Sequence, residues 1–122
     1  MEPNEMQELE MDLKLTILLI KDGPVFVAQC LEHDIAAQGK TLDECKSRFM
    51  VAFSSQVVLD LSLGKKPLQD CGQAPYKYFE KSLGFSAAGP ELPVYLPIQE
   101  KAPHIKARAQ FVASGQYAGA AP

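Results

Sequence analysis

The sequence predicts an α+β fold, in which an antiparallel sheet of three to four strands packs against one long helix. Two observations predict it. Leucine and isoleucine recur at every second position from Leu13 to Leu19, which is the period of a strand. A capped helix start at Thr41 precedes residues 42–63, which contain neither glycine nor proline. The length of 122 residues fits one domain of this kind.

Three strands are expected before the helix. The first covers Leu13–Ile20 and ends at Asp22-Gly23, a pair suited to a hairpin turn because glycine accepts a positive φ. The second covers Val25–Cys30, and the third covers Ile35–Gln38. Residues 31–34 form a short corner between the last two.

The helix is expected to run from about Leu42 to Leu63 and to end at Gly64. Thr41-Leu42-Asp43-Glu44 has the form of a capping box, in which Thr and Glu satisfy each other's free amide groups. The first half is amphipathic, but Val57–Leu63 is apolar on more than one face. This predicts contact with a partner, with a second copy, or with the chain's own C-terminal segment.

After the long helix we expect a loop and a short second helix that opens at Pro75 and ends at Gly84. Its apolar contacts are predicted to be Tyr76, Tyr78, Phe79 and Leu83. Residues 86–122 are rich in proline and glycine and are expected to be irregular, with Val94–Leu96 as a candidate edge strand. The predicted organisation is an acidic arm over 1–12, an α+β domain over 13–85, and this C-terminal segment.

Charge and composition narrow the class of protein. The net charge is −3, with five acids and no base in residues 1–12. The acids and bases of residues 13–100 nearly balance, which does not favour a general nucleic-acid binder. No apolar run is long enough for a membrane span, and three cysteines without metal-ligand spacing favour a cytoplasmic protein without a disulfide framework.

Cys30, His33 and Asp34 are residue types that form nucleophile, base and orienting group in some enzymes. Three neighbours in a tight corner seldom converge on one point, so Cys30 is expected in the core and His33 at the surface. Glu32 and Asp34 are expected to cap amides of the corner. We therefore expect no enzyme activity, no metal and no cofactor.

Tyr76, Tyr78 and Phe79 lie beside Lys77 and Lys81, a combination that can stack nucleic-acid bases. Packing of these rings onto the sheet or the long helix is the favoured interpretation, because aromatic side chains bury large apolar areas.

The order strand–strand–strand–helix, with Gly39-x-Thr41-x-x-Glu44 at the junction, resembles the HicB-like domain over roughly residues 13–68. This family includes antitoxins of HicA/HicB toxin–antitoxin systems. The resemblance implies a compact, oligomeric sheet-and-helix domain with a partial ribonuclease-H-like arrangement, which binds a small toxin ribonuclease of the HicA type and covers its active site. Many members carry a C-terminal DNA-binding element, but residues 86–122 match none, so direct DNA binding is not favoured.

The predicted function is a non-catalytic, oligomeric interaction protein, a homodimer or tetramer that binds a HicA-like toxin or another protein. Its expected interface consists of Leu18, Ile20, Val58, Leu59, Leu61 and Leu63. Residues expected to contact an anion or a partner are Lys65, Lys66, Lys101, Lys106 and Arg108. The alternative is an oligomer that sequesters a nucleotide or metabolite in a pocket at a subunit junction. An enzyme ranks last.

Overall fold

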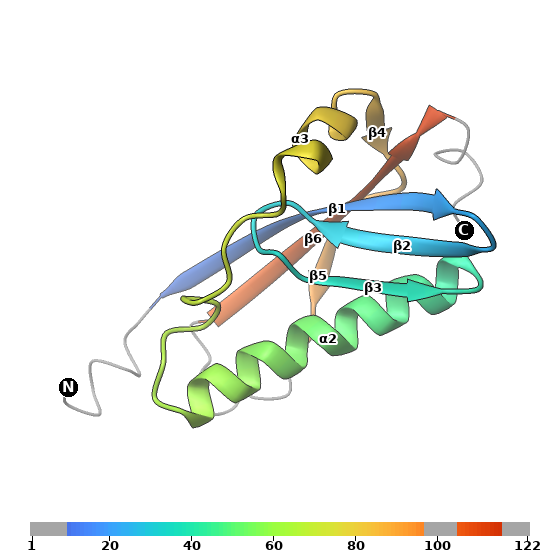
Figure 1. The fold of residues 1–122 in the computed structure, drawn as a ribbon. Helices are drawn as coiled ribbons and strands as arrows, with labels where there is room; N and C mark the ends of the chain where they lie inside the picture. Colours follow the sequence, from blue (N-terminus) through green and yellow to red (C-terminus); the bar gives the residue numbers. More distant parts are fainter. Residues whose placement is uncertain (1–9, 97–104, 116–122) are drawn as a thin grey trace.

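The computed structural model describes residues 10–96 and 105–115 as a six-stranded sheet with two helices (Figure 1). The elements follow one another as β1 (Met11–Asp22), β2 (Val25–Cys30), β3 (Ala36–Gly39), α2 (Leu42–Ser62), α3 (Tyr76–Ser82), β4 (Phe85–Ala87), β5 (Leu92–Val94) and β6 (Ile105–Ser114). The predicted α+β class is confirmed.

The sheet is larger than predicted and is mixed rather than antiparallel. Its strand order is β3-β2-β1-β6-β4, and β5 also pairs with β6. β1 pairs antiparallel with β2, whereas β1 and β6 run parallel with Met11 opposite Ile105 and Leu19 opposite Ala113. The centre of the sheet therefore joins the first and the last described strands of the chain.

The expectation of an irregular C-terminal segment over 86–122 was wrong for the part that the structure describes. β6 lies inside the sheet, between β1 on one side and β4 and β5 on the other. Its residues alternate between buried and exposed, with Ile105, Ala107, Ala109, Phe111 and Ala113 buried. The edge strand expected at Val94–Leu96 lies two residues earlier, at Leu92–Val94.

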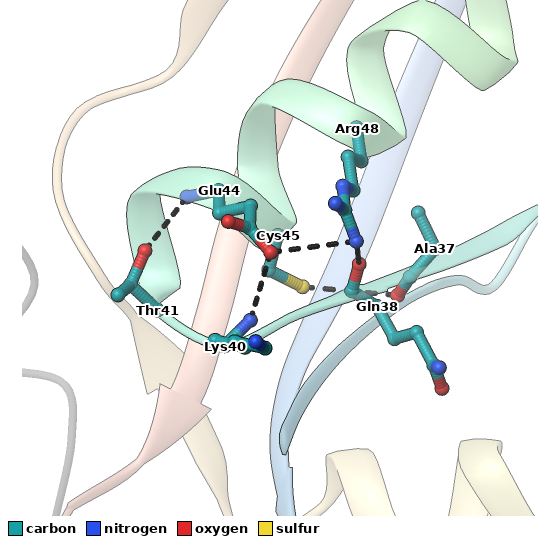
Figure 2. A network of polar contacts seen from close by, with 7 residues as sticks. All are labelled: Ala37, Gln38, Lys40, Thr41, Glu44, Cys45 and Arg48. Carbon is teal, nitrogen blue, oxygen red and sulfur yellow. Dashed lines mark hydrogen bonds and ion pairs between the residues drawn. The ribbon is translucent and has the colours of Figure 1, made fainter.

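Two local predictions for the first half of the chain are confirmed, the turn at Asp22-Gly23 and the Thr41 cap of the long helix. Gly23 has φ of +60° in the turn between β1 and β2, and Gly64 has φ of +72° just after α2. Thr41 caps α2, because its side chain accepts a hydrogen bond from the Glu44 amide at 3.1 Å. Glu44 Oε1 accepts a hydrogen bond from the Lys40 amide at 3.0 Å, whereas the predicted capping box places this bond on the Thr41 amide (Figure 2).

The junction between β3 and α2 also explains why glycine occupies position 39. A Cβ atom there would lie 2.7 Å from the backbone nitrogen of Cys45, closer than real Cβ contacts. Arg48 tightens the same junction from the next turn of α2, through a hydrogen bond to the Gln38 carbonyl and an ion pair with Glu44 (Figure 2). The Gly39-x-Thr41-x-x-Glu44 pattern is thus accounted for by local packing and capping.

The two helices cover opposite faces of the sheet (Figure 1). α2 contributes an inward stripe of Cys45, Phe49, Phe53 and Val57 to the main core, together with the odd-numbered leucine and isoleucine residues of β1. On the other face, Leu18, Leu31 and Ala74 form a smaller buried cluster, against which Tyr78 and Phe79 of α3 pack. The predicted packing of these two aromatic rings onto the sheet is therefore confirmed.

Tyr76 and Leu83 were also expected to make apolar contacts, and this was wrong. Tyr76 is 75% exposed and Leu83 is 87% exposed. They lie at the two ends of α3, where the chain enters and leaves the helix, so only the middle of this short helix reaches the sheet.

Candidate functional site

The corner between β2 and β3 is fastened to β1 by Glu32. Its carboxylate accepts hydrogen bonds from the backbone amide and from the hydroxyl of Thr16, both at 2.7 Å. Asp34 accepts a hydrogen bond at 3.0 Å from the side-chain amide of Gln29, which is buried. These carboxylates were expected to cap amides of the corner itself, and instead they tie it to the two neighbouring strands.

Cys30, His33 and Asp34 do not form a nucleophilic set in this arrangement. Cys30 is fully buried, and this burial raises the pKa of its thiol from 9.0 to about 12, so the thiol stays protonated at neutral pH. Burial lowers the pKa of His33, against a smaller opposing effect of the Glu32 charge. His33 was expected to be exposed and is half-buried. Within the described residues no side-chain hydrogen bond joins the three groups to one another.

No group of three or more His, Cys, Asp or Glu residues is placed to hold a metal ion in residues 10–96 and 105–115.

The outward side of α2 is the first candidate binding surface. We call it the α2 face, and it consists of Val51, Ser55, Val58, Leu59, Ser62 and Leu63. Residues 49–64 contain one charged residue, Asp60, and its side chain is buried on the inward side. Val51, Leu59 and Leu63 are 66%, 51% and 60% exposed. The α2 face therefore presents apolar and hydroxyl groups to solvent without a charge.

Ion pairs border the α2 face at both ends. Arg48 and Glu44 pair at 3.3 Å near the start of the helix, and Lys65 and Asp70 pair at 2.7 Å just after its end. An apolar centre with a charged rim is the usual composition of a protein–protein interface.

A hollow at the other face of the sheet is the second candidate. It lies between α3 and the end of the β1–β2 hairpin and has a volume of about 440 Å³. We call it the lysine hollow, and it is lined by Ile20, Lys21, Asp22, Val27, Lys77, Tyr78 and Lys81. Three ammonium groups and one carboxylate surround two aliphatic side chains and one aromatic ring.

The structure distributes the predicted interface residues over several places. Val58, Leu59 and Leu63 belong to the α2 face, and Leu61 is half-buried and packs against the main core. Ile20 is half-buried and lines the lysine hollow. Leu18 was expected on an open outer face, and this is corrected: Leu18 is fully buried in the cluster with Leu31 and Ala74. The α3 segment covers it, so Leu18 is not available to a partner.

The predicted basic contact residues do not gather into one patch. Arg108 forms ion pairs with Asp12 and Glu91, both at 3.2 Å, and Lys65 is paired with Asp70. Lys66 and Lys106 are exposed. Lys101 lies outside the described residues.

The lysine hollow was not predicted as a site from the sequence. Lys77, Tyr78 and Lys81 were visible as a group on one short helix, but Lys21, Asp22 and Val27 belong to a hairpin fifty or more positions earlier. Only the packing of α3 over that hairpin brings the two segments together. No sequence spacing encodes such a contact.

Comparison with known proteins finds no matching protein family, no matching curated protein and no matching solved structure. Within the described part of the chain, no helix combines the length and the apolar character needed to cross a membrane.

Proposed function

We propose that this protein is a non-catalytic interaction protein of the HicB-like type, which self-associates through the α2 face and binds a second protein. The observation that carries the proposal is the absence of outward charge along residues 49–64 of a helix that faces solvent. Helices on the surface of soluble monomers usually carry charged residues on their outer side. An uncharged outer side is instead typical of a surface that is covered in the assembled protein.

A second copy of the chain is the occupant that this surface fits best. In a two-fold symmetric dimer the same patch of both copies forms the interface, so a charge near its centre would lie close to the same charge of the second copy and be repelled by it. The α2 face avoids this repulsion because the one nearby carboxylate, Asp60, points inward and accepts hydrogen bonds from the Leu68 amide and Gln56. Ser55 and Ser62 are small, which allows two helices to approach closely.

Antiparallel crossing of two copies would also place the rim charges favourably. The Glu44–Arg48 pair of one copy would lie near the Lys65–Asp70 pair of the other, so that each end of the interface combines both signs. The apolar residues Val51, Leu59 and Leu63 would then lose their contact with water.

Self-association is tested by sedimentation velocity at micromolar concentration. We expect the wild-type chain to be a dimer or larger, and Val51→Lys/Leu59→Lys to be a monomer with an unchanged circular dichroism spectrum. Leu83→Lys is the control, because Leu83 is an exposed leucine at the end of α3, away from the α2 face, and this variant should keep the assembly. A monomeric wild-type protein contradicts the proposal.

The finer part of the proposal is the second protein, a small toxin ribonuclease of the HicA type. Its support is the resemblance over residues 13–68, which is based on the order strand–strand–strand–helix that β1, β2, β3 and α2 follow. A net charge of −3 also favours encounter with a basic partner. Co-expression with a small basic ribonuclease encoded beside this gene should restore growth and yield a complex. The absence of both growth rescue and a complex would contradict this assignment.

A further inference from the structure

We propose that the lysine hollow binds a nucleoside phosphate. This site goes beyond the interaction function, and it does not depend on self-association, because the hollow is lined by one chain. Helix α3, which lines it, lies on the side of the sheet opposite α2 (Figure 1). The volume of about 440 Å³ falls within the range of roughly 300–1,000 Å³ that is usual for small-molecule sites.

The charge of the hollow favours a ligand with more than one negative charge. Lys21, Lys77 and Lys81 line it against a single carboxylate, Asp22. Glu80, the acidic residue of α3, does not belong to the lining. Two positive charges are thus left in excess around one depression, which attracts phosphate groups.

In residues 10–96 and 105–115, no carboxylate forms an ion pair with these three lysines. The salt bridges in the described residues involve Arg48, Lys65 and Arg108, but none of the lysines of the hollow. Two of the three lie instead over aromatic rings, Lys21 at 4.3 Å from the Phe26 centroid and Lys77 at 5.1 Å from the Tyr78 centroid. A ring contact restrains an ammonium group without neutralising its charge, so its N–H donors stay available to a ligand.

The rest of the lining favours a nucleoside over a bare inorganic anion. Ile20, Val27 and the ring of Tyr78 offer an apolar surface on which a flat base can lie. Asp22 would repel a second phosphate group but can accept a hydrogen bond from a ribose hydroxyl or a base amino group. Lysines for phosphate, apolar groups for the base and one acceptor for the sugar or base are the parts that a nucleoside phosphate requires.

The test is equilibrium dialysis of the full chain at low salt with ADP, GDP, CDP, UDP and inorganic pyrophosphate. We expect at least one nucleoside diphosphate to bind, and to bind more tightly than pyrophosphate. If none of the four nucleotides binds, or if pyrophosphate binds as tightly as the best of them, the proposal is overturned.

A charge-matched pair of variants locates the site. Lys77→Gln/Lys81→Gln should weaken the binding of that nucleotide about tenfold or more, because two attractive charges are lost. Lys14→Gln/Lys40→Gln removes the same charge from two exposed residues, on β1 and just before α2, and should change affinity by less than about twofold. Equal weakening in both variants would mean that nucleotides bind by overall charge alone, which overturns the assignment. All four lysines are exposed, so neither variant is expected to unfold.

Discussion

The buried carboxylate of Asp60 holds the end of α2 against the loop that follows. It accepts a hydrogen bond at 2.7 Å from the Leu68 amide and another at 3.0 Å from the side-chain amide of Gln56. The backbone carbonyl of the same residue accepts from the Lys65 amide at 2.8 Å. Leu68 adopts a φ of +64°, which a leucine rarely does, so the Asp60 contact holds an unfavourable backbone conformation in place.

Replacing Asp60 should therefore be costly. Asp60→Ala leaves the buried Leu68 amide without its acceptor, and we expect the free energy of unfolding to fall by about 1–3 kcal/mol. Asp70→Ala is the control, since it breaks an exposed ion pair with Lys65 and should cost less than about 1 kcal/mol. Urea unfolding measures both. A smaller loss for Asp60→Ala than for Asp70→Ala would contradict this role.

Cys30 should make stability depend on alkaline pH. Burial holds the pKa of its thiol at about 12 in the folded protein, against 9.0 without burial. Because the folded value is the higher one, the unfolded chain loses this proton first, and the free energy of unfolding falls as pH rises from 9.0 toward 12. The stability of Cys30→Ala should decline less over this range. Urea titrations of both proteins at increasing pH measure the difference, and parallel declines would refute it.

At this scale, the sequence predicts the contacts between near neighbours and misses those between distant ones. The Thr41 cap with Glu44 and the turn at Gly23 depend on residues a few positions apart, so they could be predicted. The bonds of Glu32 to Thr16 and of Asp60 to Leu68 depend on where the chain returns. The spacing of these residues in the sequence does not predict that the folded chain brings them into contact.

Among the elements, β6 is the one on which the sheet depends most. It forms hydrogen-bonded ladders with β1 on one side and with β4 and β5 on the other. Three of its five inward residues are small, namely Ala107, Ala109 and Ala113, which are buried opposite Leu13, Leu15 and Leu19 of β1. Small residues here leave room for the large side chains of β1 and α2.

An inward and an outward position of β6 should therefore lose very different amounts of stability on substitution by aspartate. Ala109→Asp places a carboxylate without a partner at a fully buried position, and we expect a loss of about 3–5 kcal/mol or a failure to fold. Lys106→Asp changes an exposed residue of the same strand and should cost less than about 1 kcal/mol. Thermal and urea unfolding measure both. Comparable losses would contradict the assigned register of β6.

The same composition explains why β6 was missed while β1, β2, β3 and α2 were predicted. The alternation in Ile105–Ser114 is regular, but three of its five buried residues are alanine, which has low strand propensity and little apolar area. The prolines at positions 90, 93, 97 and 103 pointed to an irregular segment. Pro93 in fact lies in β5, a short strand at the sheet margin, where proline is tolerated.

Over the whole molecule, the sheet separates two candidate surfaces. Helix α2, which carries the α2 face, and helix α3, which lines the lysine hollow, lie on opposite sides of the sheet (Figure 1). The general expectation of an uncovered apolar area could be derived from the sequence, because residues 49–64 are nearly uncharged. The hollow could not, since it forms only where α3 packs over the β1–β2 hairpin.

This separation predicts that the two surfaces act independently. Val51→Lys/Leu59→Lys should abolish self-association and leave nucleotide affinity within about twofold. Lys77→Gln/Lys81→Gln should weaken nucleotide binding and leave self-association unchanged, as expected for distant sites. Sedimentation and equilibrium dialysis on all four proteins, including the combined variant, measure this. Loss of both properties in either variant would show that the surfaces are coupled.

The parallel pairing of β1 with β6 has a consequence for biosynthesis. Met11 lies beside Ile105, so one whole side of β1 lacks its neighbour until β6 has left the ribosome. During that time the leucines of β1 and the inward stripe of α2 lack the buried side chains of β6, which complete the main core. Closing so long a loop is slow, and a nascent chain with an open strand edge is prone to aggregate. We therefore expect this protein to need a chaperone during synthesis more than its small size suggests.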